Sequence, residues 1–442
     1  MEFPQNLAQI YQLIRQKQSN KCNKNYRFKT LLKYFNISIP SSQVIKIAGT
    51  NGKGSVSAMI EAMAIADDKK VILFTSPHLY NITERFRING QEIPTNILDQ
   101  LAKKTTIELI NFLEKEGNDM VPSFFEILTI IALKTFKLYQ ADLIILEAGI
   151  GGYNDIIHLI DGQISAITSI GLDHTNQLGS TLPEIAADKV GIASNNSILI
   201  LGSDLPNSAK NIIIKDAVKR NIKIVQANKN NFEFESLGFR GCQINLKQDL
   251  ENMSFILPLI GSFQIENFST AKTIFKQLIV NQIISDKNSL KGVSNVYWPG
   301  RMEVITGNPT WLLDAAHNGH AIEKISQELP NLMNRQKVSL LLGLSDHNNS
   351  DEIIPYLEKL IKIMQCYIYL TSGFYRAIDP KEYVDCFNKN TSNLIVIDNY
   401  KTAINHILNI YHKQNNQIIL ITGSLFLVGE CRKYLQELGV HS

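Results

Sequence analysis

Short apolar runs rich in β-branched residues alternate along the chain with longer segments in which apolar residues recur every three to four positions. The short runs predict buried strands, and the longer segments predict helices. In the first part of the chain the predicted strands are residues 44–48, 71–74, 143–146 and 164–168, and the predicted helices are about 55–66, 96–115, 124–139 and, later, 267–279. Such alternation is typical of βαβ units around a parallel sheet, which binds ligands at the carboxyl ends of its strands.

The alternation is interrupted between residues 228 and 257, where the pattern is hairpin-like, and it restarts after the Pro299-Gly300 pair. The second series of predicted strands comprises residues 311–314, 338–342, 364–370, 394–397 and 417–422. A chain of 442 residues is long enough for two domains. We therefore expect two α/β domains that divide near residue 297.

Composition excludes several classes of protein. The 44 basic and 41 acidic residues give a net charge of +3, which offers no case for a nucleic-acid groove. The five cysteines are dispersed without a C-x-x-C pair, so we expect reduced thiols in a cytoplasm and no zinc site. No apolar run has the length of a signal peptide or a membrane span. We expect a soluble, cytoplasmic protein without nucleic-acid or membrane partners, and nothing argues for more than a monomer.

A glycine-rich segment, Gly49-Thr50-Asn51-Gly52-Lys53-Gly54-Ser55, lies between the first predicted strand and the next helix. Glycines expose backbone N–H groups, and the helix N-terminus adds partial positive charge, so this turn suits a phosphate. Lys53 would supply a charge for the β- and γ-phosphates of a nucleotide, and Ser55 a hydroxyl near phosphate or metal. Ile47 replaces the first glycine of the usual Walker pattern and Gly54 separates Lys53 from Ser55, so a metal ion would need a hydroxyl from elsewhere.

From this loop onward the sequence resembles the folylpolyglutamate synthase and dihydrofolate synthase family of Mur-type ligases. The resemblance rests on motifs in family order, which span residues 44–430. Besides the loop they are Thr75-Ser76-Pro77-His78-Leu79, Glu84-Arg85-Phe86-Arg87-Ile88-Asn89-Gly90, Ser123-Phe124-Phe125-Glu126, Glu147-Ala148-Gly149-Ile150-Gly151-Gly152, Gly171-Leu172-Asp173-His174-Thr175, Pro299-Gly300-Arg301, Asp314-Ala315-Ala316-His317-Asn318 and Thr422-Gly423-Ser424-Leu425. The resemblance implies a P-loop ATPase-type parallel-sheet domain over residues 1–297 and a Rossmann-like glutamate-ligase domain over residues 298–442.

The resemblance also implies a reaction. The γ-phosphoryl group of ATP would pass to a carboxylate of dihydropteroate or folate, and L-glutamate would attack the resulting acyl phosphate to form an amide. Phosphoryl transfer depends on positioning and on neutralising charge, which calls for magnesium and a cationic cradle. By resemblance, two Mg²⁺ ions would be bound by Ser76, Glu147, His174 and Lys189, with Lys189 converted to a carbamate. Taken singly, Glu147 at the end of its apolar strand suits a metal ion, with a solvent-facing strand-terminal carboxylate as the alternative, and Lys189 reads as a solvated surface lysine.

The remaining candidates are assigned by the same resemblance. Those for ATP outside the loop are Asn267, Arg301 and Asp314. His317 and Ser424 resemble glutamate-site residues, and His317 joins Lys53 and Lys189 as a catalytic candidate. Those for the acceptor are Ser123, Asn154, Asp155 and Ile156. The acceptor segment departs from the family pattern R-x-D-A-T-N, because Tyr153 replaces the Arg and the Thr-Asn pair is absent.

Three alternatives stay open at this point. Another Mur-type amino-acid ligase would share the loop chemistry but would require an additional N-terminal domain for a nucleotide-linked sugar. A non-catalytic ATP-binding regulator would bind nucleotide without forming an amide. A simple P-loop kinase would release ADP without glutamate. The sequence leaves open whether dihydropteroate, folates or both are the acceptor.

Overall fold

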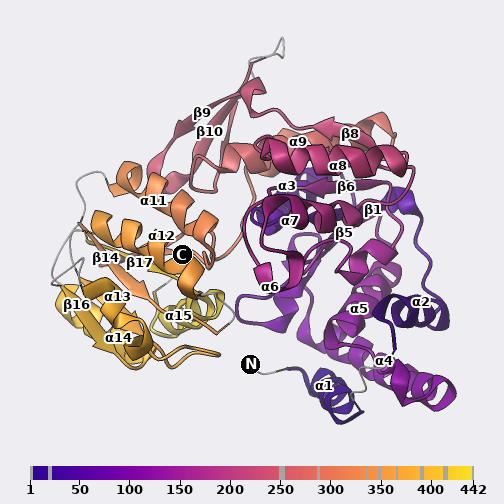
Figure 1. The fold of residues 1–442 in the computed structure, drawn as a ribbon, viewed down its shortest axis with the longest axis horizontal. Helices are drawn as coiled ribbons and strands as arrows, with labels where there is room; N and C mark the ends of the chain where they lie inside the picture. Colours follow the sequence, from indigo (N-terminus) through magenta and orange to yellow (C-terminus); the bar gives the residue numbers. More distant parts are fainter. Residues whose placement is uncertain are drawn as a thin grey trace. The chain divides into compact units, whose positions relative to one another are not determined.

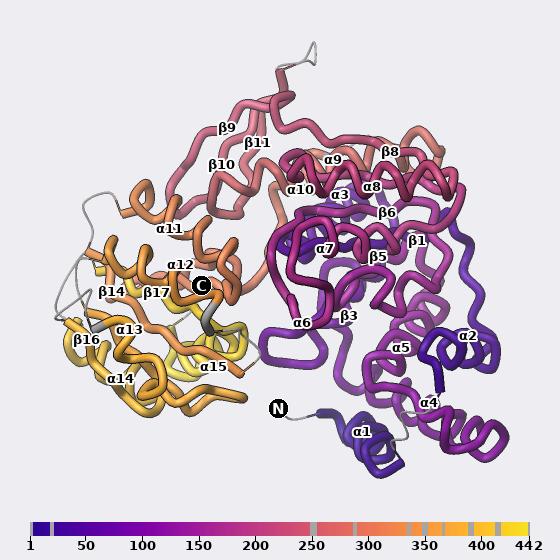
Figure 2. The backbone as a smooth tube through the Cα atoms, in the orientation of Figure 1, coloured from indigo at the N-terminus to yellow at the C-terminus, as the bar shows by residue number. Residues whose placement is uncertain are grey.

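The computed structural model describes residues 3–17, 22–247, 254–285, 289–333, 337–346, 350–364, 367–388, 393–411 and 417–440. The chain forms two compact units, each with its own sheet. Unit 1 comprises residues 1–231 and 266–296, and unit 2 comprises residues 232–265 and 297–442. Figure 2 lets the chain be followed from one unit into the other. Among the described residues, no helix has the length and apolar character needed to cross a membrane.

Unit 1 is built on an eight-stranded sheet in the order β4-β3-β2-β5-β1-β6-β7-β8 (Figure 1). Its strands are β1 Val44–Ala48, β2 Val71–Phe74, β3 Phe86–Ile88, β4 Gln91–Glu92, β5 Leu143–Glu147, β6 Ile164–Ile167, β7 Ile198–Leu201 and β8 Lys223–Gln226. Neighbouring strands are parallel along the series β2-β5-β1-β6-β7-β8. At the other edge, β3 pairs antiparallel with β2 and with β4. β1, β2, β5 and β6 are buried throughout, as expected for parallel strands covered on both faces.

The helices of unit 1 follow the strands in the manner that the sequence predicts. They are α1 Gln5–Lys17, α2 Lys24–Tyr34, α3 Lys53–Ala66, α4 Thr95–Glu116, α5 Phe124–Tyr139, α6 Thr175–Leu178, α7 Leu182–Lys189, α8 Asn207–Lys219, α9 Gln264–Val280 and α10 Ser289–Val293. The predicted helices near 55–66, 96–115, 124–139 and 267–279 are thus confirmed to within three residues at each end. α7 begins with the Thr181–Glu184 capping box.

Unit 2 contains a six-stranded sheet in the order β12-β13-β17-β14-β15-β16, parallel except at β12. These strands are β12 Glu303–Ile305, β13 Thr310–Leu313, β14 Lys337–Leu342, β15 Ile368–Thr371, β16 Leu394–Ile397 and β17 Gln417–Thr422. The helices are α11 Gly319–Met333, α12 Ser350–Ile363, α13 Val384–Asn388, α14 Tyr400–Tyr411 and α15 Leu425–Glu437. The strand predicted at 364–370 starts later, at Ile368, and residues 365–366 lie outside the described part.

The hairpin-like segment between the two α/β series forms a three-stranded antiparallel sheet. Its strands are β9 Phe232–Ser236, β10 Cys242–Leu246 and β11 Ser254–Leu257. The chain passes from unit 1 to unit 2 at residue 297, where the domain division was predicted. That prediction placed the hairpin-like segment in the first domain. The segment groups instead with unit 2, where Phe239 and Phe263 pack against the apolar core around Ile325 and Leu329.

Candidate active site

The glycine-rich loop connects β1 to α3 and ends in a left-handed residue. Gly52 has φ +83° and precedes the first residue of α3. A methyl group built on Gly52 would lie 2.3 Å from Oδ1 of Asn267, which leaves no room for a larger residue. The same distance places the Asn267 side chain, on α9, directly against the loop. Two candidates that are 215 positions apart are therefore neighbours.

Hydrogen bonds from the segment after β6 hold the loop in place. The Thr168 and Ser169 hydroxyls donate to the Asn51 carbonyl over 2.6 and 2.9 Å. The Thr50 hydroxyl donates to the Gly171 carbonyl over 3.1 Å and accepts from the Gly171 N–H over 3.0 Å. The loop is thus shaped before a ligand arrives, which lowers the entropy lost on binding.

The Nζ atoms of two lysines meet at one backbone oxygen of the loop. Lys53 Nζ donates to the carbonyls of Gly49 and Thr50 over 3.0 and 3.2 Å. Lys189, the last residue of α7, is buried, and its Nζ donates to the Gly49 carbonyl over 3.1 Å. Burial, together with the charge of Lys53, lowers the pKa of Lys189 from 10.5 to about 7. Lys189 is therefore a buried amine at the loop and not a solvated surface lysine.

Glu147 and Ser76 lie together at the carboxyl ends of β5 and β2. Both are buried, and the Ser76 N–H donates to Glu147 Oε2 over 3.3 Å. The Ser76 Oγ is buried and makes no hydrogen bond to any described residue. A methyl group built on Gly149 would lie 3.4 Å from Ser76 Oγ and 3.3 Å from Asp155 Oδ2, so both oxygens face the same glycine. Oxygen atoms thus converge where these strands end.

His174 lies in the loop between β6 and α7, with φ +51°, and starts the short helix α6. Its side chain is 33% exposed, and Nε2 lies 3.9 Å from Asp173 Oδ1. Within the described ranges, no three His, Cys, Asp or Glu side chains form a group that could hold a metal ion. The structure therefore brings Ser76 and Glu147 together, but it does not assemble a ready-made cage of protein ligands that includes His174.

The segment expected to contact the acceptor is held by its own carboxylate. Asp155 is buried and accepts backbone N–H groups from Gly149, Ile150 and Ile157 over 2.7, 3.1 and 2.9 Å. Burial raises the pKa of Asp155 to about 6. Ile156, also buried, follows it at the start of a 3-10 turn. The carboxylate therefore fixes the loop that follows the double glycine.

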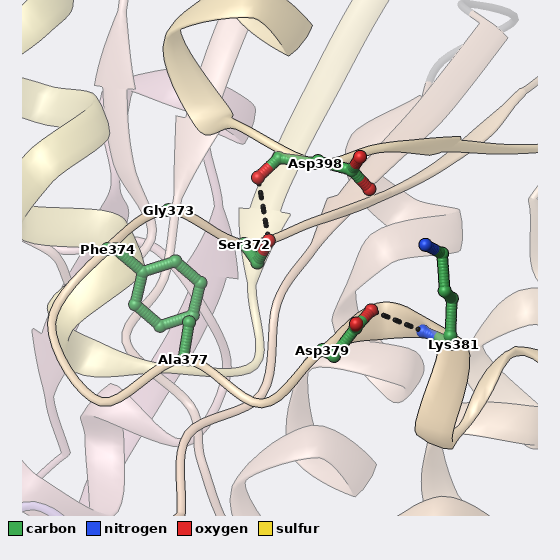
Figure 3. A pocket seen from close by; sticks show the side chains of 7 residues that line it. All are labelled: Ser372, Gly373, Phe374, Ala377, Asp379, Lys381 and Asp398. Atoms are coloured by element: carbon green, nitrogen blue, oxygen red, sulfur yellow. Dashed lines mark hydrogen bonds between the residues drawn. The ribbon is translucent and has the colours of Figure 1, made fainter.

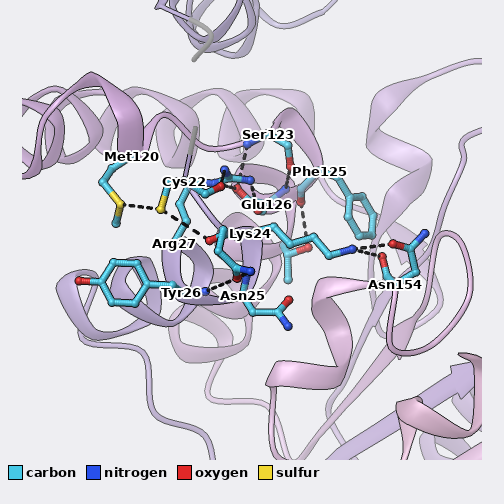
Figure 4. Close-up of polar contacts among 12 residues, drawn as sticks. Cys22, Lys24, Asn25, Tyr26, Arg27, Met120, Ser123, Phe125, Glu126 and Asn154 are labelled. Atoms are coloured by element: carbon cyan, nitrogen blue, oxygen red, sulfur yellow. Dashed lines mark hydrogen bonds and ion pairs between the residues drawn. The ribbon is translucent and has the colours of Figure 1, made fainter. Parts of the chain in front are cut away.

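Helix α2 contributes a lysine to this acceptor segment. Lys24 Nζ donates to the carbonyl and to Oδ1 of Asn154 over 2.8 and 2.7 Å (Figure 4). One turn later, Arg27 forms a two-pronged ion pair with the buried Glu126, over 2.9 and 2.8 Å. Glu126 also accepts the Ser123 N–H over 2.8 Å, which completes the capping box at the N-terminus of α5. Two residues of α2 therefore hold the Ser123 cap and Asn154 in place.

Tyr153 is the residue that departs from the family pattern, and the centroid of its ring lies 6.0 Å from that of His158. A methyl group built on Gly191 would lie 2.3 Å from its ring, and the Arg220 guanidinium lies 5.4 Å from the ring centroid. The hydroxyl lies 3.5 Å from Asp216 on α8. Tyr153 therefore packs against α8 and the end of α7.

The candidates of unit 2 gather at the carboxyl ends of the neighbouring strands β13 and β17. Asp314 is buried and accepts the N–H groups of Met302 and Ala316, both over 2.9 Å; burial raises its pKa. The Nδ1 of His317 lies 2.8 Å from the Ala315 carbonyl. Ser424, fully buried, starts α15. Arg301 precedes Met302 in the turn before β12.

The family model for the Mur ligase middle domain matches residues 47–274, more than half of the chain. The family model for the Mur ligase, glutamate ligase domain matches residues 300–425. The dihydrofolate synthase/folylpolyglutamate synthase of Buchnera aphidicola subsp. Acyrthosiphon pisum is 31% identical over 336 residues, covering 75% of this chain and 76% of that protein. The chain belongs to the dihydrofolate synthase/folylpolyglutamate synthase family of Mur ligases. It is an ATP-dependent ligase that adds glutamate to folates.

Two solved structures of this family share the fold over almost the whole chain. Mycobacterium tuberculosis folylpolyglutamate synthase complexed with ADP has a TM-score of 0.85 at 23% identity, covering 97% of this chain and 98% of that one. The bifunctional synthase of Yersinia pestis complexed with AMPPNP and Mn ion has a TM-score of 0.79 at 23% identity, covering 99% and 100%. A Haloferax volcanii relative, a probable bifunctional folylpolyglutamate synthase/dihydropteroate synthase, is 27% identical; the match covers 88% of this chain but 45% of that longer protein.

Neither Arg85 nor His78 of the ligase was a predicted site residue, and the charge of Arg85 interacts with that of Glu147. Arg85 is buried, and its Nε donates to His78 Nδ1 over 2.9 Å. Burial lowers the pKa of Arg85 to about 10, and the negative charge of Glu147 opposes that shift. Burial, with the charge of Arg85, lowers the pKa of His78 to about 3, so the imidazole is neutral. Both residues belong to motifs that the sequence displays, but the contact becomes visible only in the fold.

A cavity of about 330 Å³ in unit 2 of the ligase contains none of the predicted site residues (Figure 3). It lies beyond β15 and β16, where the Ser372 hydroxyl donates to the Asp398 carbonyl over 2.7 Å. Phe374, Asp379 and Lys381 also line it. The candidates therefore gather in the loops described above and not in this cavity.

Proposed function

We propose that this ligase transfers the γ-phosphoryl group of ATP to a carboxylate of dihydropteroate or of a folate. The amine of L-glutamate then attacks the acyl phosphate, a C–N bond forms, the C–O bond to phosphate breaks and the amine loses a proton. The observation that carries the proposal is the pre-shaped loop at which Lys53 Nζ meets the Gly49 carbonyl. A cationic group at a rigid phosphate loop is what phosphoryl transfer requires.

The loop residues Gly49–Ser55 would hold the phosphates through backbone N–H groups, and Lys53 would neutralise charge that builds up on the β- and γ-phosphates. Asn267, whose side chain lies against Gly52, would contact a nucleotide bound at the loop. Arg301 would bind phosphate through its guanidinium, and Asp314 would accept from ribose or from a metal-bound water. These roles follow the family resemblance.

The donor set at the strand ends fits a magnesium ion. Magnesium takes one or two carboxylates and completes its shell with phosphate oxygens and water. Glu147 supplies the carboxylate, and the Ser76 Oγ is a buried oxygen without a hydrogen bond to any described residue, which suits a metal ligand. Bound there, the ion would neutralise phosphate charge. His174 would serve a second ion together with Lys189.

Lys189 has the properties of a lysine that reacts with carbon dioxide. A carbamate forms when a neutral amine attacks CO₂, creating an N–C bond and releasing a proton, and a pKa of about 7 leaves much of Lys189 neutral. We expect native mass spectrometry to find protein heavier by one CO₂, and activity of CO₂-stripped enzyme to return with bicarbonate. An unmodified mass with full activity, or a Lys189→Ala variant at the normal rate, would exclude the carbamate.

The two substrates would bind at different loops. His317 and Ser424, at the ends of β13 and β17, would orient the incoming glutamate. Ser123, Asn154, Asp155 and Ile156 would shape the acceptor site, with Asp155 acting through the backbone that it holds. Because dihydropteroate and folates share a pterin linked to an aminobenzoyl group and each presents a free carboxylate, we propose that both are acceptors at one site.

The proposal is tested by glutamate-dependent ADP release with ATP and magnesium, with dihydropteroate and tetrahydrofolate supplied in parallel. We expect products heavier by one glutamyl unit from both acceptors. A Glu147→Gln variant should lose at least about a hundredfold in kcat, because a magnesium ion would be held less tightly and the negative charge of the transferring phosphoryl group would then be less well neutralised. ATP binding without glutamate-dependent turnover on either acceptor would refute the ligase assignment and favour a non-catalytic ATP-binding regulator.

A further inference from the structure

The turn that carries Arg301 has an unusual backbone. Gly300 has φ +67°, and Met302, on the other side of Arg301, has φ +51°. Positive φ is rare for a non-glycine residue and costs free energy, so it persists only where the surroundings hold it. Met302 is also buried, at 1% exposure. The structure therefore fixes the direction in which Arg301 leaves the backbone.

Two buried carboxylates hold this turn, one on each side of Arg301. Asp314 Oδ2 accepts the Met302 N–H over 2.9 Å, and Glu303 Oε2 accepts the Gly300 N–H over 2.9 Å. The Gly300 carbonyl accepts the Ala315 N–H over 2.9 Å. Hydrogen bonds to ionised groups are about twice as strong as neutral ones. The peptide groups that flank Arg301 are therefore held from both sides.

Glu303 depends in turn on a residue of the last helix. Its side chain is 4% exposed, and Arg432 Nε, on α15, lies 3.0 Å from each of its carboxylate oxygens. The Tyr297 hydroxyl donates to Glu303 Oε1 over 2.8 Å and accepts from Arg432 Nη2 over 2.6 Å. A buried carboxylate without such partners would be strongly unfavourable. Arg432 thus holds the Glu303 side chain in place.

We propose that Glu303 and Arg432 are positioning residues for ATP: they hold the Gly300–Met302 turn so that the Arg301 guanidinium meets a phosphate. The inference rests on the proposed function, in which Arg301 is an ATP contact. Glu303 and Arg432 act through the backbone of Arg301 and need not touch the nucleotide. Replacing either residue should let the Gly300–Met302 turn relax and should therefore weaken ATP binding.

The test is a double-mutant cycle on the full chain, with the Kd for ATP measured by calorimetry, so that it does not require ligation. Arg432→Gln should raise the Kd roughly tenfold, the loss of about one good hydrogen bond. Arg432→Lys, which keeps the charge, should recover part of that loss. In an Arg301→Ala background the Arg432→Gln change should have no further effect on Kd.

The matched control is Lys433→Gln on the same helix, whose Nζ lies 3.7 Å from Glu437; it should leave the Kd unchanged. Tyr297→Phe is a milder change should Arg432→Gln fold poorly, and it should raise the Kd by a smaller factor. Equal losses in the wild-type and Arg301→Ala backgrounds would overturn the proposal, since Arg432 would then act only on general stability.

The Kd for ATP and the glutamate-dependent turnover test the positioning role and the ligase reaction separately. An unchanged Kd in Arg301→Ala would remove Arg301 from the ATP site and would overturn the inference with it. A cycle that shows coupling in a protein without glutamate-dependent turnover would support the inference on ATP positioning and refute the ligase reaction.

Discussion

Lys46 lies in the middle of β1, the strand that leads into the phosphate loop, and its side chain is completely buried. Its Nζ donates to Ser194 Oγ over 2.9 Å. Its Cε packs against Gly162, where an added methyl group would lie only 3.0 Å away. Burial lowers the pKa of Lys46 from 10.5 to about 7, against the opposing charge of Asp161. We predict that Lys46 makes the stability of the protein depend on pH.

The sign follows from proton binding in the two states. Between about pH 7 and 10.5 the unfolded chain keeps the proton of Lys46, whereas the folded chain has lost it. Raising the pH therefore favours the folded state, by about 1.4 kcal/mol per pH unit for one group. From pH 7.5 to 9.0 the gain is about 2 kcal/mol. Below about pH 7 the charge is retained in both states and this dependence ends.

The assay compares the wild type with Lys46→Met, which keeps the length of the side chain but cannot titrate. Urea unfolding followed by circular dichroism gives the free energy of unfolding of each protein at several pH values. The wild type minus the variant should rise by about 2 kcal/mol from pH 7.5 to 9.0. The same comparison with Lys215→Met, an exposed lysine on α8, should give no slope.

A difference that stays constant with pH to within about 0.5 kcal/mol would refute the reasoning, because a lysine with a lowered pKa must change its proton occupancy in this range. A difference that falls with rising pH would mean that the folded state stabilises the charged form, and hence that Ser194 and Asp161 outweigh burial.

Three further predictions concern the acceptor side of unit 1. Lys24→Met should raise the KM for the acceptor several-fold and leave the KM for ATP unchanged in steady-state assays, because it frees Asn154 and not the phosphate loop; an equal rise in both would contradict this. Gly152→Ala should lower the melting temperature, since its methyl would lie 2.5 Å from the Lys189 carbonyl; an unchanged melting temperature would show that the backbone can shift there. Arg27→Met should cost about 3–5 kcal/mol in urea unfolding by leaving Glu126 buried without its partner, and a loss below 1 kcal/mol would mean that Glu126 becomes protonated or solvated.

Local patterns were sufficient for the elements that carry the candidate site. The apolar run before Gly49 and the glycines after it predict a strand, a turn and a helix, and the structure has β1, the loop and α3 there. The Thr181–Glu184 capping box likewise marks the start of α7. These features depend on residues within a few positions of one another, so the sequence displays them directly.

Contacts between distant segments could not be predicted in the same way. The Lys24 contact with Asn154 joins residues 130 positions apart, and each looks like an ordinary polar surface residue. Lys46 stands in an apolar strand, yet only the fold reveals that Ser194 is its hydrogen-bond partner. The hairpin-like segment 232–265 groups with unit 2 because of tertiary packing, and periodicity says nothing about the core against which a strand packs.

The central claim, that the phosphate loop directs ATP onto the acceptor's carboxylate, is tested most directly by isotope transfer. Tetrahydrofolate with its glutamate-tail carboxylates labelled with ¹⁸O is turned over with ATP, magnesium and L-glutamate, and the released phosphate is analysed by mass. An acyl-phosphate route places one ¹⁸O atom in each phosphate, because the C–O bond breaks when the amine attacks. Glutamate-dependent product with unlabelled phosphate would contradict the account, since the carboxylate oxygen would then never have been phosphorylated.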